Sequence, residues 1–344
     1  MFAVVVTLFV ALRAFAAEPH SGESPADHLP PHITRLTSFG ERADWSHDGK
    51  KLLFLSKTFG DAMELNIATG VIRNLTAHYP HHGYTRALYL ANGDILLAGP
   101  LSFDPNDPGA ARWNCYLYVL DKSGKKPAAP LSARCNEGPA VSRKRMHIAW
   151  TEWGDAAAGD SSQINSSDVV FDEGTPKLAN LTPVLSNSDL GFRCRMETQN
   201  FRPPEERELI FSAYTVAGDK CDVCGVDLAT KQVTKYTDSP EVYDEPEGIL
   251  PDGHATLVEC DSQNRQGPGH IDIWKLALNP NVSGSGKYER LTFFSDYPGY
   301  KASNPVVSDD GRWIAFQMGQ SVDAAGVGHG IFIYDLEKAD SGER

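Results

Sequence analysis

The sequence is short of basic residues, of long apolar runs and of helical periodicity. Its 32 Lys and Arg stand against 45 Asp and Glu, a net charge of −13. An acidic chain without a basic stripe repels phosphate backbones, so we expect no nucleic-acid partner. Beyond residue 30 there is no apolar run that could span a bilayer as a helix, and no useful stretch of helical periodicity. With 41% hydrophobic residues, the chain is therefore expected to build its core from strands.

Two signatures of chemistry are also missing. No Gly-x-Ser-x-Gly nucleophile turn occurs, which argues against α/β-hydrolase chemistry. The Cys221 and Cys224 pair stands alone, whereas a zinc ribbon needs a second such knuckle and a thioredoxin-type site needs a βαβ context. We interpret the cysteines as structural residues of an oxidising compartment. The six are Cys115, Cys135, Cys194, Cys221, Cys224 and Cys260.

The first residues indicate a cleaved secretory signal. Phe2–Leu12 is an apolar run of 11 residues, and Ala14-Phe15-Ala16 supplies the small-x-small pattern of a signal-peptidase site. No Lys or Arg precedes the run and Arg13 follows it, so a retained anchor stays open as the alternative. We expect a signal peptide over 1–16, a linker over 17–32, and a secreted monomer without a membrane span after cleavage, extracellular or, in a bacterium, periplasmic. Four sequons predict a glycoprotein if the source is a eukaryote, at Asn74, Asn165, Asn180 and Asn281.

One motif recurs six times along the chain. It is an apolar residue followed by Thr or Ser, with the hydroxyl residues at positions 37, 76, 132, 182, 237 and 292. Each copy is followed by a turn that leads into an apolar strand, and in four copies the turn is Asp-Gly or Asn-Gly, a strong hairpin signal. Alternating strands such as LYVLDKSG (117–124) and IFIYDLEK (331–338) lie before most hydroxyl pairs. Four short strands in a period of about 50 residues, repeated six times, are typical of a β-propeller.

The two ends of the chain indicate how the ring closes. The last unit stops after IFIYDL without a Leu-Thr strand of its own, whereas ITRLT at 33–37 precedes any complete unit. We expect ITRLT to be the outer strand of the sixth blade, which removes the open edge between the first and last blades. The predicted fold is all-β: a six-bladed β-propeller of four-stranded blades over 33–338, followed by a tail at 339–344.

The fullest copy of the repeat resembles a known family. ERLTFFSDYPGYKASNPVVSDDGRWIAFQM, residues 289–318, carries Leu-Thr, a spacer, Pro-x-x-Ser-Asp-Asp-Gly and an apolar strand, which is similar to the TolB-like propeller repeat. The resemblance spans about residues 33–338 and implies the propeller fold. It implies no single reaction, because such repeats occur in periplasmic translocation proteins, in prolyl-oligopeptidase-like hydrolases and in oligogalacturonide lyases. We expect neither the hydrolase domain nor the N-terminal α/β domain that accompanies some of these propellers.

Polar residues gather in segments that we expect to be loops before the inner strands of blades 4, 5 and 6. A channel narrows toward the inner strands, so side chains from neighbouring blades can reach one ligand. Tyrosines can stack on a sugar or peptide, carboxylates and amides can orient it, and Lys301 is the one cation expected to meet an anion or to pair with Glu247. The predicted ligand-binding residues are Glu197, Gln199, Asn200, Tyr243, Asp244, Glu245, Glu247, Tyr300, Lys301 and Asn304.

Two long loops end in the similar sequences Gly-Pro-Gly-His270 and Gly-Val-Gly-His329. A repeated turn would explain them without any function. The alternative is that both imidazoles lie near one mouth of the channel, where they could bind a divalent metal. The sequence establishes no cofactor, and His270 and His329 are its candidate metal ligands.

Cys115 and Cys135 form the one disulfide that the sequence predicts. Cys115 begins the third strand of a blade and Cys135 follows the fourth strand of the same blade. Antiparallel neighbours bring these two ends together, which suits a disulfide.

These features favour a ligand-binding module for a saccharide, peptide or protein partner. Four loops are much longer than folding requires, and loops on a rigid ring are a common place for binding residues. The alternative is a metal-assisted lyase or hydrolase resembling oligogalacturonide lyases, in which a cation polarises an acidic sugar and a side-chain base removes a proton. The full ligand set of that family cannot be matched onto this chain. A purely structural role also stays open.

Overall fold

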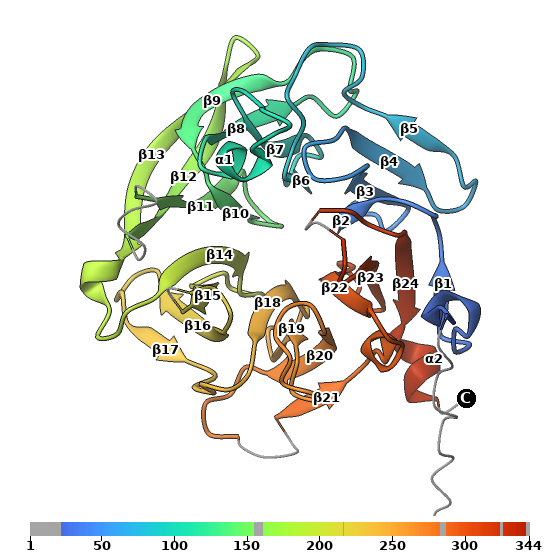
Figure 1. The fold of residues 1–344 in the computed structure, drawn as a ribbon. Coiled ribbons are helices and arrows are strands. Elements are labelled where there is room, and N and C mark those ends of the chain that lie inside the picture. The colour runs from blue at the N-terminus through green and yellow to red at the C-terminus, as the bar shows by residue number, and fades with distance from the viewer. Residues whose placement is uncertain (1–21, 155–160, 216, 283–286, 324–325, 342–344) are drawn as a thin grey trace, which may run out of the picture.

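The structure, a computed structural model, describes residues 22–154, 161–215, 217–282, 287–323 and 326–341. These residues form six four-stranded antiparallel sheets around a central axis (Figure 1). The predicted six-bladed β-propeller is therefore confirmed. The predicted signal peptide at 1–16, the start of the linker and the end of the tail lie outside the described residues. Among those described, no helix has the length and apolar character needed to cross a membrane.

The blades follow the chain in order, and within each blade the strands run outward from the channel. From the channel outward, blade 1 consists of β2 (Glu41–Trp45), β3 (Lys51–Leu55), β4 (Ala62–Asn66) and β5 (Ile72–Asn74), and blade 2 of β6 (Arg86–Tyr89), β7 (Ile95–Pro100), β8 (Cys115–Leu120) and β9 (Ala129–Arg134). Blade 3 consists of β10 (Glu137–Val141), β11 (His147–Trp153), β12 (Ser162–Asp172) and β13 (Thr175–Ser186), and blade 4 of β14 (Arg195–Phe201), β15 (Glu208–Tyr214), β16 (Cys221–Asp227) and β17 (Val233–Lys235). Blade 5 consists of β18 (Asp244–Ile249), β19 (Ala255–Cys260), β20 (Asp272–Ala277) and β21 (Tyr288–Arg290), and blade 6 of β22 (Tyr300–Val307), β23 (Trp313–Gln320), β24 (Ile331–Asp335) and β1 (Ile33–Arg35). The helical segments are short: η1 (Pro25–Asp27), α1 (Pro108–Arg112), η3 (Asn187–Asp189), η5 (Phe294–Asp296) and α2 (Leu336–Asp340).

The ring closes as predicted, by the first strand joining the last blade. β1 pairs antiparallel with β24, with Ile33 opposite Tyr334. Beyond the strand, the amide of Leu36 donates to the carbonyl of Ile331 at 2.8 Å. Figure 1 shows β1 (blue) beside β24 (red), so the two ends of the chain share one sheet.

The recurring Thr ties the fourth strand of a blade to the third. In blade 1 the buried Thr76 hydroxyl accepts a hydrogen bond from the amide of Ala62 at 3.1 Å and donates to the Asp61 carboxylate at 2.8 Å. The hydroxyls of three other repeats accept the equivalent amide bond, namely Thr237 from Val223, Thr292 from Ile273 and Thr37 from Ile331. Ser132 and Thr182 are exposed instead. In four of the six blades, the hydroxyl of this motif therefore fixes the outermost strand to its neighbour by a hydrogen bond.

Apolar clusters of buried side chains fill the space between each pair of neighbouring blades. The cluster between blades 6 and 1, for example, contains Trp45 and Phe54 from blade 1 and Ala315 and Ile331 from blade 6. Each sheet has its faces covered by the sheets beside it, so one blade alone cannot bury its apolar side chains.

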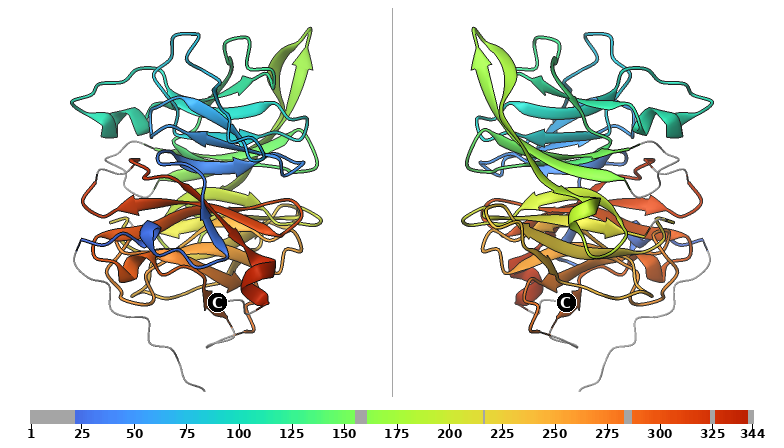
Figure 2. Two further views of the ribbon diagram at one scale, coloured as in Figure 1. Left: turned by 90° about the vertical axis from the view of Figure 1, so that its right-hand side faces the viewer. Right: turned by 90° about the vertical axis from the view of Figure 1, so that its left-hand side faces the viewer.

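The hairpin of β12 and β13 projects beyond the ring, as the side views show (Figure 2). Its strands of 11 and 12 residues are longer than their counterparts in the other blades. The sequon residue Asn165 lies within it and is only 8% exposed, which leaves little room for a glycan there. The other three sequon asparagines, Asn74, Asn180 and Asn281, are exposed.

Candidate functional site

The inner strands of all six blades begin at the same face of the ring, because every blade repeats the same up-and-down order. Their beginnings surround a cavity of about 420 Å³, the mouth cavity. Every blade contributes to it. The side chains that define it here are Glu41, Arg42, Arg86, Arg112, Trp153, Arg195, Glu197, Tyr214, Tyr243, Glu245, Glu247, Glu259, Lys301, Asn304 and Gln317.

The segments that we predicted as loops before the inner strands of blades 4, 5 and 6 are largely strands, and this part of the prediction is wrong. β14, β18 and β22 begin at residues 195, 244 and 300 and include most of the predicted ligand-binding residues. These strands are hard to recognise in the sequence because five of the six inner strands contain a bulge, which interrupts the alternation of inward and outward side chains. At two of these bulges Arg42 and Asn304 have φ values of 54° and 49°. A bulge turns extra side chains of one strand toward the channel.

Six of the ten predicted ligand-binding residues meet in the mouth cavity. They come from the inner strands of blades 4, 5 and 6 or, for Tyr243, from the residue just before one. All but Lys301 are buried. The six are Glu197, Tyr243, Glu245, Glu247, Lys301 and Asn304. The predicted convergence of these three blades on one cavity therefore agrees with the geometry, while a ligand stays a prediction.

The other four predicted residues lie elsewhere. Gln199 and Asn200 line a second cavity, nearer the opposite end of the channel. Asp244 is buried within blade 5, where it accepts a hydrogen bond from the Tyr288 hydroxyl at 2.8 Å, and burial raises its pKa to about 6. Tyr300 begins β22 opposite Gln320 and lies outside the lining of the mouth cavity.

His270 and His329 also lie outside the lining of the mouth cavity. Nε2 of His329 pairs with the Asp323 carboxylate at 2.5 Å. The backbone carbonyl of His270 accepts hydrogen bonds from the side chains of Gln263 and Asn264, both at 2.9 Å, which closes its loop. Their role as metal ligands stays a prediction.

A buried ion-pair network crosses the mouth cavity. Nη2 of Arg86, from blade 2, lies 3.5 Å from Oε1 of Glu197 and 3.3 Å from Oε1 of Glu247. Asn304 donates from its side chain to Glu247 at 2.8 Å and from its backbone amide to Glu259 at 2.7 Å. Side chains from blades 2, 4, 5 and 6 thus hold one another across the channel.

Two tyrosines and two perturbed carboxyl groups lie beside this network. The hydroxyls of Tyr214 and Tyr243 both donate to the Glu245 carboxylate. Burial, followed by the nearby carboxylates of Glu259 and Glu247, raises the pKa of Glu245 to about 8. Burial, followed by the carboxylate of Glu247, raises the pKa of Glu259 to about 7. Carboxyl groups that titrate near neutral pH can act as hydrogen-bond donors as well as acceptors, and as acids or bases.

The same carboxylates are the residues that could hold a metal. Oxygen atoms of Glu245, Glu247 and Glu259 lie within 4.8 Å of one another. An all-oxygen set of this kind suits a hard divalent cation such as Ca²⁺ or Mg²⁺. Neither His270 nor His329 belongs to this group.

Sequence reasoning missed several residues of the mouth cavity. Lys301 is not its one cation, because Arg42, Arg86, Arg112 and Arg195 also line it, and the Lys301 ammonium donates to the carbonyl of Pro268 at 3.0 Å. The pairing of Glu247 with Lys301 that the sequence suggested is replaced by a pairing with Arg86.

Two more missed residues had a visible signal. Glu259 ends the apolar strand segment HATLVE, and Gln317 ends RWIAFQ. Both segments are second strands, yet these polar side chains reach the mouth cavity. A buried polar residue at the end of an otherwise apolar strand is unusual enough to flag a site.

Cys115 and Cys135 lie side by side as predicted. β8 pairs with β9 antiparallel, and the amide of Cys135 donates to the carbonyl of Cys115 at 2.9 Å. The structure has no disulfide among the residues it describes, so the bond itself stays a prediction.

Comparisons with known proteins support the fold and leave the function open. No protein-family model matches the chain. The curated 1,4-alpha-glucan branching enzyme GlgB of Myxococcus xanthus is 26% identical over 170 residues, which cover 41% of this chain and only 22% of that enzyme. Over so small a part of its length, the match transfers no activity.

Solved structures similar to the chain are propellers of varied function. A gluconolactonase from Xanthomonas campestris has a TM-score of 0.54 at 12% identity, with 88% of each chain covered. A puromycin-hydrolyzing peptidase from Mycobacterium tuberculosis has a TM-score of 0.51 at 12% identity, covering 86% of this chain and 44% of that one. TolB from Acinetobacter baumannii has a TM-score of 0.47 at 15% identity, covering 87% and 66%. At these identities the likeness is one of fold alone, and it carries no function over to this chain.

Proposed function

We propose that this chain is a secreted binding propeller whose mouth cavity takes a saccharide. The observation that carries the proposal is the set of buried polar side chains, from five of the six blades, around one cavity of about 420 Å³. Sugar hydroxyls both donate and accept, so one ring can satisfy the carboxyl groups, the Arg86 guanidinium and the Asn304 amide together. The volume lies within the range of roughly 300–1,000 Å³ that is usual for small-molecule sites.

Two aromatic rings in the lining of the cavity support the same ligand class. Trp153 and Tyr214 both line the cavity, and the guanidinium of Arg195 lies 4.6 Å from the first ring centroid and 5.4 Å from the second. A sugar face can stack on such rings while its hydroxyls reach the polar wall. A peptide or protein partner would approach the same cavity through the long loops around it.

The test is a binding screen of the intact protein against a panel of soluble oligosaccharides and peptides, followed by titration calorimetry of each hit. Glu247→Gln and Lys301→Met should each weaken saccharide binding about tenfold. The matched exposed variants Glu289→Gln and Lys275→Met, which lie opposite each other on the outer strands of blade 5, should leave it unchanged. Saccharide hits that the mouth variants do not weaken, or a screen that yields only peptide hits, would refute the proposal.

The metal-assisted lyase or hydrolase is the second candidate, favoured by the close approach of Glu245, Glu247 and Glu259. A cation there would polarise an acidic sugar, and a neighbouring carboxyl group with a raised pKa could move a proton. Metal analysis of the purified protein and melting curves with Ca²⁺, Mn²⁺ and Zn²⁺ test it. A cation that binds the folded state raises the melting temperature. Glu259→Gln should remove that increase, and the absence of any increase in the parent protein removes this candidate.

Secretion is also a proposal. The signal peptide at 1–16 would be removed, and the mature protein would begin at residue 17. N-terminal sequencing of the protein from its natural source tests this, since an intact Met1 would identify a retained anchor instead.

A further inference from the structure

The channel has a second cavity of about 420 Å³, the far cavity, around the ends of the inner strands. Because these strands begin at the mouth face, their ends lie toward the opposite face of the ring. Arg42, Arg86, Glu247 and Asn304 line both cavities, so they form a polar partition between the two.

The wall of the far cavity is largely apolar, unlike that of the mouth cavity. Each of the six inner strands contributes at least one apolar side chain to it: Ala43, Leu88, Val141, Phe201, Ile249 and Val306. Leu88, Val141, Ile249 and Val306 keep part of their surface accessible. An enclosed apolar wall with a few polar groups at one side is the usual environment of a small apolar ligand.

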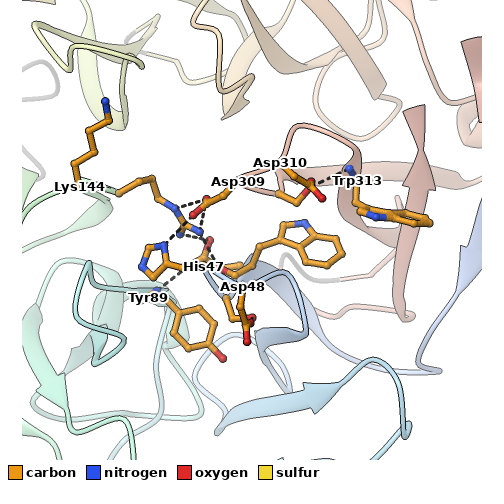
Figure 3. A network of polar contacts seen from close by, with 12 residues as sticks. His47, Asp48, Tyr89, Lys144, Asp309, Asp310 and Trp313 are labelled. Carbon is orange, nitrogen blue, oxygen red and sulfur yellow. Dashed lines mark hydrogen bonds and ion pairs between the residues drawn. The ribbon is translucent and has the colours of Figure 1, made fainter. Parts of the chain in front are cut away.

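A fixed arginine lies at the rim of this cavity. Arg143, in the turn after β10 of blade 3, donates from Nε to the Asp309 carboxylate of blade 6 at 2.8 Å and from Nη2 to the carbonyl of Trp45 in blade 1 at 2.9 Å. Nδ1 of His47 lies 3.0 Å from the same Asp309 carboxylate (Figure 3). The charge of Arg143 is therefore already balanced within the protein.

The neighbouring Lys144 differs in this respect. Its ammonium donates to the carbonyl of Pro204, a neutral acceptor, and it forms no ion pair with a carboxylate of the described part of the chain. Figure 3 shows it apart from the His47–Asp309 contact. The far cavity is lined by the basic Arg42, Arg86, Arg143 and Lys144 against the acidic Asp44, Glu247 and Asp309. Arg42 and Arg86 also contact carboxylates outside this lining, those of Glu41 and Glu197. Lys144 is therefore the lining cation that has no carboxylate partner among the described residues.

We propose that the far cavity is a second binding site, for a small amphiphilic carboxylate. The alkyl part would contact the apolar side chains of the six inner strands, and the carboxylate would pair with Lys144 at the rim. Removing the alkyl chain from water drives the binding, and the lysine selects an anionic head over a neutral or cationic one. This site does not depend on the function proposed for the mouth cavity.

Titration calorimetry of the intact protein with decanoate tests the proposal, with 1-decanol and decyltrimethylammonium as neutral and cationic comparisons. We expect saturable binding of one decanoate per chain. Val141→Trp, which fills the cavity, should weaken decanoate binding at least tenfold. Lys144→Gln should weaken it roughly fivefold, as expected for one rim ion pair, and should leave the binding of 1-decanol unchanged.

Matched variants separate this site from general surface binding. Val71→Trp and Lys177→Gln change exposed residues away from the channel and should have no effect, and Lys301→Met in the mouth cavity should also have none. Circular dichroism and melting temperature check that Val141→Trp is folded, and Leu88→Phe replaces it if it is not. Unsaturable binding, equal affinity of the parent and Lys144→Gln for decanoate, or equally tight binding of decyltrimethylammonium would each overturn the proposal.

Discussion

Four glutamates are buried around one arginine in the mouth cavity, and this is costly for the fold. Glu197 and Glu247 contact Arg86, while Glu245 and Glu259 lie beyond it with raised pKa values. Burying charged groups rarely adds net stability compared with apolar residues of similar volume. Such a cluster is therefore easier to explain by binding or chemistry than by folding.

Arg86→Met is expected to lower the free energy of unfolding by about 3–5 kcal/mol, since removing one partner of a buried ion pair leaves the other charge uncompensated. Urea denaturation measures the change. The exposed pair of Lys177 and Asp172 supplies the control, and Lys177→Met should cost about 1 kcal/mol or less. Adding Glu247→Gln to Arg86→Met should restore part of the loss, and a loss that stays complete in the double variant would contradict the role of this pair.

Stability should fall as the pH rises from about 4.5 to about 8. In that range the folded protein keeps the proton of Glu245, whose pKa is about 8, while the unfolded chain, with a pKa of 4.5, has released it. Glu259 acts in the same direction up to about pH 7. The folded state binds more protons, so raising the pH favours unfolding. Melting temperatures between pH 5 and pH 8 should show a clearly shallower slope in Glu245→Gln than in the parent, with Glu289→Gln as the exposed control; equal slopes would disprove this.

Cys115 and Cys135 should be linked in the protein from its natural source, because the register of β8 and β9 places them opposite each other. Mass spectrometry of the non-reduced, digested protein should find one peptide that joins them. A linkage of Cys115 to Cys260 would contradict the structure of blade 2, since Cys260 ends a strand of blade 5.

Residues of the mouth cavity could be predicted from the sequence only where several of them lie close together along the chain. Tyr243, Glu245 and Glu247 lie within five residues, so one segment revealed all three. Arg86 comes from blade 2 and meets the site through ring closure, a relation that no local pattern contains. Glu259 lies in the same blade as Glu245, directly opposite it on the neighbouring strand. The local signal that Glu259 offered, a charge at the end of an apolar strand, was readable but was not used.

At the scale of strands, the recurring Thr should matter only in the blades where it is buried. Thr237→Val and Thr292→Val keep the side-chain shape but leave a buried amide unpaired and remove one hydrogen bond to an Asp carboxylate, which should cost about 1–3 kcal/mol each. The exposed Thr182→Val is the matched control and should stay within about 0.5 kcal/mol. Chemical denaturation tests all three, and an equal cost at Thr182 would show that the motif acts through strand propensity instead.

Turn residues predicted the positions of the strands well, whereas the alternation of apolar and polar residues predicted them poorly. The Asp-Gly and Asn-Gly turns correctly predicted where the second strands begin. Gly49 and Gly93, for example, have φ values of 67° and 85°, which glycine adopts in a tight turn without strain. The inner strands of blades 4, 5 and 6 were largely predicted as loops, because their bulges break the period of two and their polar side chains face the channel. Positions with a binding geometry are thus the ones where the sequence pattern is least regular.

At the scale of the whole ring, closure by β1 should be essential. Ile33 is buried against blade 6 while its neighbour Thr34 is exposed, so the two positions test closure on one strand. Ile33→Asp places a charge in that core and should cost at least about 3 kcal/mol, whereas Thr34→Asp should change stability by less than about 0.5 kcal/mol. Thermal unfolding of both variants measures this, and equal melting temperatures would mean that the ring holds without its closing strand.

The position of β1 also has a consequence for how this protein is made. Its partner β24 lies about 300 residues later in the chain, which at a synthesis rate of about 5–20 residues per second takes roughly 15–60 seconds to emerge from the ribosome. During that time Trp45, Leu52 and Phe54 of blade 1 lack the blade 6 side chains that cover them in the finished ring. The nascent chain therefore carries an uncovered apolar surface until blade 6 has been synthesised, and we expect it to need a chaperone during that interval.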